Sequence, residues 1–231
     1  QGWEIGMLSV CRSYGIKDTI GFSHATSRYW DLRNFYDLRE YASKNLLRLP
    51  RPKILAVNSK NVLYEFLKFG YPKNEIRLVE ALRHSYLNVN NGLSLNKNNK
   101  NKTFILLGDY EDKNTKNQLS VLNEISKNVL NDLEIIFKPH PASKLNIKSF
   151  TSLKIRIMED PIADLLPLTK IVFCGSVTSA SVDAFSYGLK VIVLRDPTIL
   201  NLSPLRNFKE VSFVKDSKEL QEIIIKFFLE N

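Results

Sequence analysis

The C-terminal half of the chain alternates short apolar runs with amphipathic segments. Runs rich in Ile, Val, Leu and Phe are typical of strands buried on both faces, and helical segments between them connect parallel strands. The pattern therefore predicts a doubly wound parallel sheet of roughly five or six strands. The expected strands cover 103–110, 133–141, 153–159, 170–176, 190–196 and 210–216, and the expected helices 117–130, 161–169, 178–189 and 217–230, the last with Ser217 as N-cap.

A similar but less regular alternation occurs before residue 90. An amphipathic segment at 61–70 predicts a helix that ends on Gly70. The stretch 27–41 is rich in aromatic and arginine side chains, so we expect a partly exposed loop or short helix there. Together these elements make about half of a second domain of the same kind. The expected strands are 18–25, 53–59 and 75–82.

The stretch 88–102 separates the two patterns. Asn, Lys, Gly and Ser dominate it, which is typical of an exposed linker. We expect a partial N-terminal lobe over 1–90, a linker over 91–102 and a C-terminal domain over 103–231. The chain starts with Gln and shows no signal peptide, so we also expect a fragment of a longer polypeptide, which leaves open a catalytic group outside these residues.

Composition narrows the class of protein. The 44% hydrophobic and 25% charged residues are those of a globular protein, and no run approaches the ~18 apolar residues that span a bilayer. We therefore expect a cytoplasmic protein in which Cys11 and Cys174 are buried and reduced. Only three histidines and no Asp-x-Asp sequence are present, so we expect no metal and no cofactor.

The net charge of +9 has two interpretations. It is either a solvated lysine-rich surface or an attraction to phosphate, in a nucleotide, an acidic glycan or an anionic membrane. A nucleic-acid site needs a contiguous basic face with interleaved aromatic residues, and only 28–41 approaches one. We therefore expect no nucleic-acid partner.

Polar motifs follow three of the expected strands. Ligands of open parallel sheets bind at the carboxyl ends of strands, where the strand order reverses. The hydroxyls of Ser176, Thr178 and Ser179 at a helix start suit a phosphate, although such residues also serve as helix caps. The motifs are Gly108-Asp109, Lys138-Pro139-His140-Pro141 and Gly175-Ser176-Val177-Thr178-Ser179.

His140 lies between two prolines, which restrict the backbone on both sides. Lys138 points the same way along the strand, so the two side chains are suited to a diphosphate or a leaving nucleotide. Asp183, one turn into the following helix, is placed either to accept from ribose hydroxyls or to face solvent or a lysine.

A second group of candidates lies near the N-terminus. His24 ends an expected strand next to hydroxyl residues, with Asp31 close behind it, which favours a general base. A histidine satisfied by a backbone carbonyl is the alternative. Glu4 is a second candidate base, and we expect Arg28 and Arg33 to contact an anionic acceptor or a phosphate.

These motifs resemble those of a known group of enzymes. Lys-Pro-His-Pro, Gly-Ser-Val-Thr-Ser-Ala-Ser-Val-Asp-Ala and Tyr-Gly-Leu-Lys-Val-Ile-Val are similar to the donor domain of GT-B glycosyltransferases. The likeness is greatest to sialyltransferases and Kdo transferases with a His-Pro motif, and to CDP-glycerol glycerophosphotransferases. Gln-Gly-Trp-Glu, Ile-Gly-Phe-Ser-His-Ala-Thr and Tyr-Trp-Asp-Leu-Arg resemble bacterial O-antigen or capsule biosynthesis proteins.

The resemblance implies a GT-B-like α/β fold with two Rossmann-like lobes, the N-terminal, acceptor-side one incomplete. It implies a transferase that takes a nucleotide sugar or related donor, with cytidine favoured, and a glycan or lipid-linked acceptor at the inner membrane face. His140 would meet the donor phosphate, and Ser176, Thr178 and Ser179 the phosphate or an anionic sugar group. Asp183 would meet ribose or sugar hydroxyls, and His24 would be the base. The alternatives are a non-catalytic nucleotide-sugar-binding module and a nucleotide-sugar epimerase.

Overall fold

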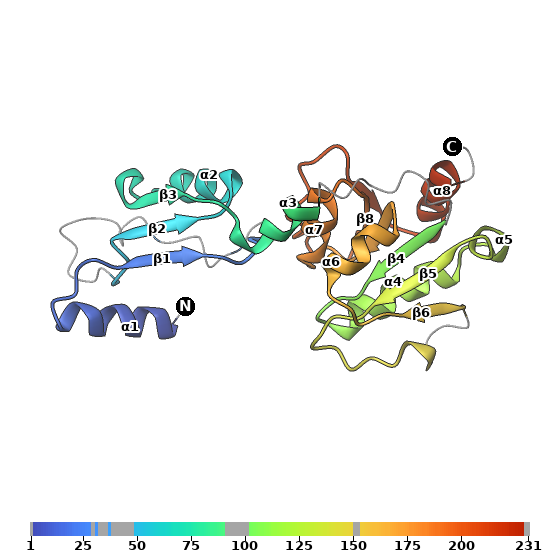
Figure 1. Cartoon of the computed structure of the whole chain (residues 1–231), viewed down its shortest axis with the longest axis horizontal. Coiled ribbons are helices and arrows are strands. Elements are labelled where there is room, and N and C mark those ends of the chain that lie inside the picture. Colours follow the sequence, from blue (N-terminus) through green and yellow to red (C-terminus); the bar gives the residue numbers. More distant parts are fainter. Residues whose placement is uncertain are drawn as a thin grey trace. The chain divides into compact units, whose positions relative to one another are not determined.

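The computed structural model describes residues 2–28, 31, 37, 49–90, 102–149 and 153–228. The chain divides into two compact units, Gln1–Ser85 and Tyr86–Asn231, each with its own parallel sheet (Figure 1). The sequence places 86–90 in the first lobe, whereas Leu87 packs in the core of the second unit. The expected linker lies outside the described residues, except for Lys102.

The N-terminal unit has a three-stranded parallel sheet in the order β1-β2-β3. The helix α2 begins after Ser59, whose hydroxyl accepts from the Asn61 and Val62 N–H groups, and Gly70 follows its end with φ 86°, as predicted. The core consists of Val57, Val62, Phe66, Tyr71 and Ile76. The elements are α1 (Gly2–Ser13), β1 (Ile20–Ser23), β2 (Ile54–Val57), α2 (Lys60–Lys68) and β3 (Ile76–Leu78), with 3-10 turns at Lys73–Glu75 and Leu82–His84.

The sequence pattern missed α1. A helix of a globular protein is recognised by one apolar and one polar face. In α1 the apolar side chains of Trp3, Met7 and Val10 are exposed, while Glu4 lies partly inside, so the pattern lacks a clear polar face. Gly6 in the middle of the helix weakens the helical signal further.

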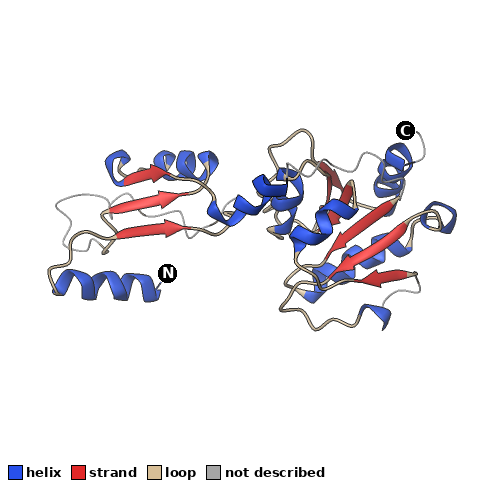
Figure 2. Cartoon of the chain, viewed as in Figure 1, coloured by secondary structure: helices blue, strands red, loops and turns tan. Residues whose placement is uncertain are grey.

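The C-terminal unit is a complete doubly wound sheet. Its strand order is β6-β5-β4-β7-β8-β9, with every pair parallel. Helices lie on both sides of these strands (Figure 2). The elements are α3 (Ser85–Asn90), β4 (Thr103–Leu107), α4 (Asp112–Asn123), α5 (Lys127–Leu130), β5 (Glu134–Lys138), β6 (Ile155–Ile157), α6 (Ile162–Leu165), β7 (Ile171–Cys174), α7 (Ala180–Ser186), β8 (Lys190–Leu194), β9 (Ser212–Val214) and α8 (Ser217–Phe228), with 3-10 turns at Ile147–Ser149 and Leu166–Leu168.

Side chains alternate between the two faces of this sheet, as the strand period of two requires. Along β4, Phe104 and Leu106 pack against α4, α5 and α8, whereas Ile105 and Leu107 pack against α3, α6 and α7. Both clusters are fully buried around β4. The side chains of the continuous apolar run that predicted a central strand therefore belong to two separate hydrophobic clusters, one on each face of the sheet.

Two local predictions differ from the structure. The single helix expected over 117–130 is two helices, α4 and α5, with Glu124–Ser126 between them. The N-cap of α8 is Asp216 rather than Ser217, because the Asp216 carboxylate accepts from the Glu219 N–H at 2.9 Å. The Ser217 hydroxyl instead donates to Glu124 at 2.9 Å.

Candidate functional site

The carboxyl ends of β4, β5 and β7 meet at one edge of the C-terminal sheet. The register pairs Leu107 with both Lys138 and Cys174, so the three strands end level with one another. The chain runs from β4 outward to β5 and β6 and then returns to β7, which makes the β4–β7 boundary the point where the strand order reverses. His140 and the Ser176–Ser179 turn therefore follow strands that end at the same edge, as predicted, while their closeness to each other and their roles stay predictions.

His140 is held in a defined orientation. Its Nδ1 accepts from the Ala142 N–H at 3.1 Å, and its carbonyl accepts from the Ser143 N–H at 2.9 Å. Gly108 has no side chain, which allows the backbone nitrogen of His140 to come close. A Cβ on Gly108 would lie 3.2 Å from that backbone nitrogen. Because Nδ1 accepts, the neutral ring carries its proton on Nε2 and offers that N–H as a donor.

Lys138 lies at the same edge as the last residue of β5. Its ammonium donates to the carbonyls of Glu159 at 3.1 Å and Pro139 at 3.3 Å. An ammonium has three donors, so one remains for a ligand. Lys138 therefore links the ends of β5 and β6 and still carries a positive charge at this edge.

The Ser176–Ser179 turn joins β7 to α7. Ser179 is the N-cap residue of α7, and its side chain makes no capping hydrogen bond. Ser176 and Thr178 are buried. Asp183, in the first turn of α7, is also buried at 4% exposure, so little of its carboxylate faces solvent.

Two buried acceptor oxygens flank Gly175. Asp109 and Gln118 are 1% and 0% exposed, and Asp109 Oδ2 and Gln118 Oε1 have no hydrogen-bond donor in the described part of the chain. A Cβ on Gly175 would lie 3.0 Å from the first and 3.9 Å from the second. Asp109 is fixed in place, because its Oδ1 accepts from the Glu111 N–H and its own N–H donates to Thr115 Oγ1. A buried acceptor without a hydrogen-bond donor lowers the stability of a fold, and a functional role is one reason why native proteins keep such acceptors.

Replacing Asp109 with Asn is expected to stabilise the protein by about 1–2 kcal/mol, because the amide keeps the Oδ1 acceptor and puts a donor in place of Oδ2. Chemical denaturation with urea measures the change. Asp132→Asn, at an exposed turn, is the control and should leave stability unchanged. A loss of stability in Asp109→Asn contradicts the expectation, since it would mean that the carboxylate has a partner that requires both oxygens.

Cys174 ends β7 beside Asp109. Burial raises the pKa of its thiol, and the charge of Asp109 raises it further. The thiol remains an S–H group directed at the Ile192 carbonyl, 3.6 Å away. Cys174 is buried as predicted, whereas Cys11 is only half-buried.

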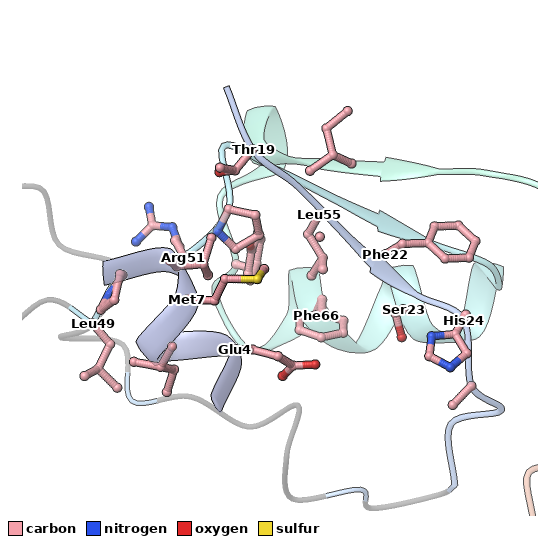
Figure 3. A pocket seen from close by; sticks show the side chains of 18 of the residues that line it. Glu4, Met7, Thr19, Phe22, Ser23, His24, Leu49, Arg51, Leu55 and Phe66 are labelled. Atoms are coloured by element: carbon pink, nitrogen blue, oxygen red, sulfur yellow. The ribbon is translucent and has the colours of Figure 1, made fainter. Parts of the chain in front are cut away.

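The N-terminal unit contains a pocket of about 550 Å³ (Figure 3). Glu4 reaches it from α1, and His24 follows β1 on the same pocket. Asp31 also lines it, so the structure brings the three predicted catalytic residues together. Apolar side chains form most of the remaining wall, namely Trp3, Ile5, Met7, Leu8, Ile20, Phe22, Leu49, Leu55, Phe66 and Tyr71.

Asp31 does not hold the His24 ring, as a catalytic pair would require. Among the described residues no side chain or carbonyl bonds to either ring nitrogen of His24, which is exposed. The charge of Asp31 instead acts on α2, where it adds to burial in raising the pKa of Glu65. Arg28 is exposed and does not line the pocket, and Arg33 lies outside the described residues.

Sequence reasoning missed Arg51, which lines the pocket between β1 and β2. Its guanidinium forms a two-point ion pair with Glu75, at 2.5 and 2.8 Å. This pair ties the strand-connecting segment to the turn before β3. An arginine far in sequence from its carboxylate gives no local signal, so the pair was not predictable.

No protein-family model matches the chain, and no curated protein matches its sequence. Several solved structures match its fold. Anabaena Alr3699/HepE, crystallised with UDP and glucose, is 12% identical with a TM-score of 0.55, and the match covers 98% of this chain and 67% of that one.

Two epimerases are also similar. The UDP-GlcNAc 2-epimerase of Methanocaldococcus jannaschii, in complex with UDP-GlcNAc and UDP, is 18% identical with a TM-score of 0.62, covering 97% of this chain and 65% of that one. The UDP-N-acetylglucosamine 2-epimerase of Rickettsia bellii is 13% identical with a TM-score of 0.58, covering 100% and 71%. The chain spans about two thirds of the length of these proteins.

These likenesses define the fold. It is α/β and GT-B-like, with two Rossmann-like lobes of which the N-terminal one is incomplete. In the described ranges no helix is long and apolar enough to cross a membrane. In the same ranges, no three His, Cys, Asp or Glu side chains gather as a metal-binding group.

Proposed function

We propose that the chain is the donor-binding part of a metal-independent GT-B glycosyltransferase, or of a glycerophosphate-type transferase, that acts in bacterial surface polysaccharide synthesis. The donor is a nucleotide-activated sugar or related group, and the acceptor is a glycan or a lipid-linked glycan. The protein works in the cytoplasm, with peripheral contact to the anionic inner membrane face. The net charge of +9 supports that contact.

The observation that carries this proposal is the orientation of His140 at the carboxyl edge of the sheet, next to the end of β4. The Ala142 N–H occupies Nδ1, so the neutral imidazole can only donate, through Nε2. A fixed donor at the same sheet edge as Lys138 and the hydroxyls of Ser176, Thr178 and Ser179 suits an anion such as the donor phosphate. The charge that develops on a departing nucleotide would be stabilised in the same way.

In this proposal the N-terminal pocket supplies the base. His24 removes the proton of the acceptor hydroxyl, and Glu4 is the second candidate for that step. Asp31 contributes negative charge to the pocket rather than a hydrogen bond to His24. Arg28 contacts an anionic acceptor or phosphate, and Asp183 meets ribose or sugar hydroxyls.

A nucleotide panel tests the donor site. We expect CMP and CDP to bind more tightly than UDP, UMP or GDP, and a nucleotide at 100 times its Kd to stabilise the protein by about 2.7 kcal/mol. Thermal-shift measurements give the ranking, and isothermal titration gives the affinities. A clear preference for UDP would overturn the cytidine assignment, and failure of all five nucleotides to bind would overturn the donor site.

An epimerase is the second candidate function. Two carboxylates, Glu4 and Asp31, line one pocket, and an epimerase needs groups that move protons on either side of a sugar. The proteins similar in fold include epimerases. Incubation with a nucleotide sugar in deuterated water, without acceptor, distinguishes an epimerase from a transferase. Deuterium in recovered nucleotide sugar would show epimerase chemistry, whereas a transferase leaves the donor unlabelled.

A further inference from the structure

Tyr110 lies beside His140 at the edge of the C-terminal sheet. The two rings are edge-to-face, with centroids 5.5 Å apart and an interplanar angle of 89°. Tyr110 belongs to the segment between β4 and α4, and it is 66% exposed. A tyrosine this exposed adds little to the core. Packing in the core therefore does not explain its contact with His140.

Two other hydrogen bonds restrain the His140 segment. The Ser143 hydroxyl donates to Asp112 Oδ1 at 2.6 Å, which ties this segment to the start of α4. The Ala142 N–H fixes which ring nitrogen faces away from the backbone. A swing of the imidazole to another side-chain rotamer would break the bond from the Ala142 N–H, a single bond that costs little to lose at this exposed edge. The Tyr110 ring stands on one side of the imidazole and disfavours that swing.

We propose that Tyr110 is a positioning residue of the donor site, whose ring holds His140 with its Nε2–H ready for the ligand phosphate. This inference rests on the proposed function for the identity of the ligand. The two aromatic rings provide the contact that positions His140. The tyrosine hydroxyl is therefore dispensable, and the aromatic ring is not.

Three variants of the full chain test this role. Tyr110→Ala should weaken binding of CMP and of inorganic pyrophosphate about 2- to 10-fold, the range of one aromatic pair. Tyr110→Phe should bind both like the wild type. Tyr64→Ala removes a tyrosine of equal exposure, 66%, from the other unit and should change nothing. The midpoint of urea unfolding should be unchanged in Tyr110→Phe, and in Tyr110→Ala it should fall by no more than the loss of one ring contact.

A double-mutant cycle shows whether Tyr110 acts through His140. In a His140→Ala background, Tyr110→Ala should have no further effect on affinity. Side-chain ¹⁵N NMR, recorded over a pH series, gives the tautomer of the neutral His140 ring without any ligand. The Nε2–H tautomer should dominate in the wild type and in Tyr110→Phe, and should lose population in Tyr110→Ala.

The outcomes separate this inference from the proposed function. Unchanged affinity and tautomer in Tyr110→Ala overturn the positioning role, as does a Tyr110→Phe variant as weak as Tyr110→Ala. Additive effects in the double mutant overturn it as well. If the wild type binds neither nucleotide nor pyrophosphate while the tautomer shifts in Tyr110→Ala, the donor site fails and the positioning of the ring stands.

Discussion

Replacing His24 with Ala is expected to lower the rate of transfer by about 10²–10⁴, the usual contribution of a general base. The imidazole is exposed, lines the pocket, and has no hydrogen-bond partner in the described part of the chain, so both nitrogens are open to an acceptor. The loss should appear in kcat, while nucleotide affinity should stay the same, because the proposed nucleotide site belongs to the C-terminal sheet. Steady-state kinetics with saturating donor measure the effect.

A matched histidine in the same unit is the control for this variant. His84 lies in the 3-10 turn Leu82–His84, outside the pocket lining, so His84→Ala should keep full turnover. Glu4→Gln provides the second arm of the experiment. Normal turnover in His24→Ala together with a large loss in Glu4→Gln would move the base to Glu4 and give His24 a structural role.

The second large effect is expected at His140. Removing a hydrogen bond to a charged group costs about 1.5–3 kcal/mol, so His140→Ala should weaken nucleotide binding about 10- to 100-fold. Two further variants separate the roles of the ring nitrogens. His140→Asn keeps an acceptor for the Ala142 N–H but loses the distal donor, whereas His140→Gln keeps a donor near the position of Nε2.

Isothermal titration of the three His140 variants with the preferred nucleotide measures their loss of affinity. We expect His140→Gln to retain more affinity than His140→Asn, because the ligand contact is assigned to Nε2. The reverse order would show that the bond to Ala142 matters more than the outward donor, and His140 would then be a residue that only shapes its segment.

Much of the C-terminal unit was predictable because its strands are buried on both faces. Apolar runs such as the one from Thr103 to Leu107 leave few alternatives to a parallel strand, and helices between them fix the winding. The turn after β7 and the level ends of β4, β5 and β7 follow from that topology. The predicted location of His140 at the sheet edge rested on this regularity.

The remaining features depend on contacts that leave no periodic signal. The helix α1 was missed because its apolar residues are exposed, and the pocket because its lining comes from segments between Trp3 and Tyr71. Tyr110 and Gln118 lie near Gly108–Asp109, yet only the fold shows that one contacts His140 and the other faces Gly175. Asp31 and His24 line the same pocket without a hydrogen bond between them in the described part of the chain, since proximity in sequence does not set the direction of a side chain.

The burial of Cys174 has a chemical consequence for the whole chain. A thiol whose pKa is raised by burial and by the charge of Asp109 supplies almost no thiolate, which is the form that oxidants and alkylating reagents attack. The chain has two cysteines, so its thiol reactivity in the folded state is confined to half-buried Cys11 on α1. Thiol oxidation or a disulfide link between two folded copies would therefore begin in the N-terminal unit and spare the sheet that carries His140.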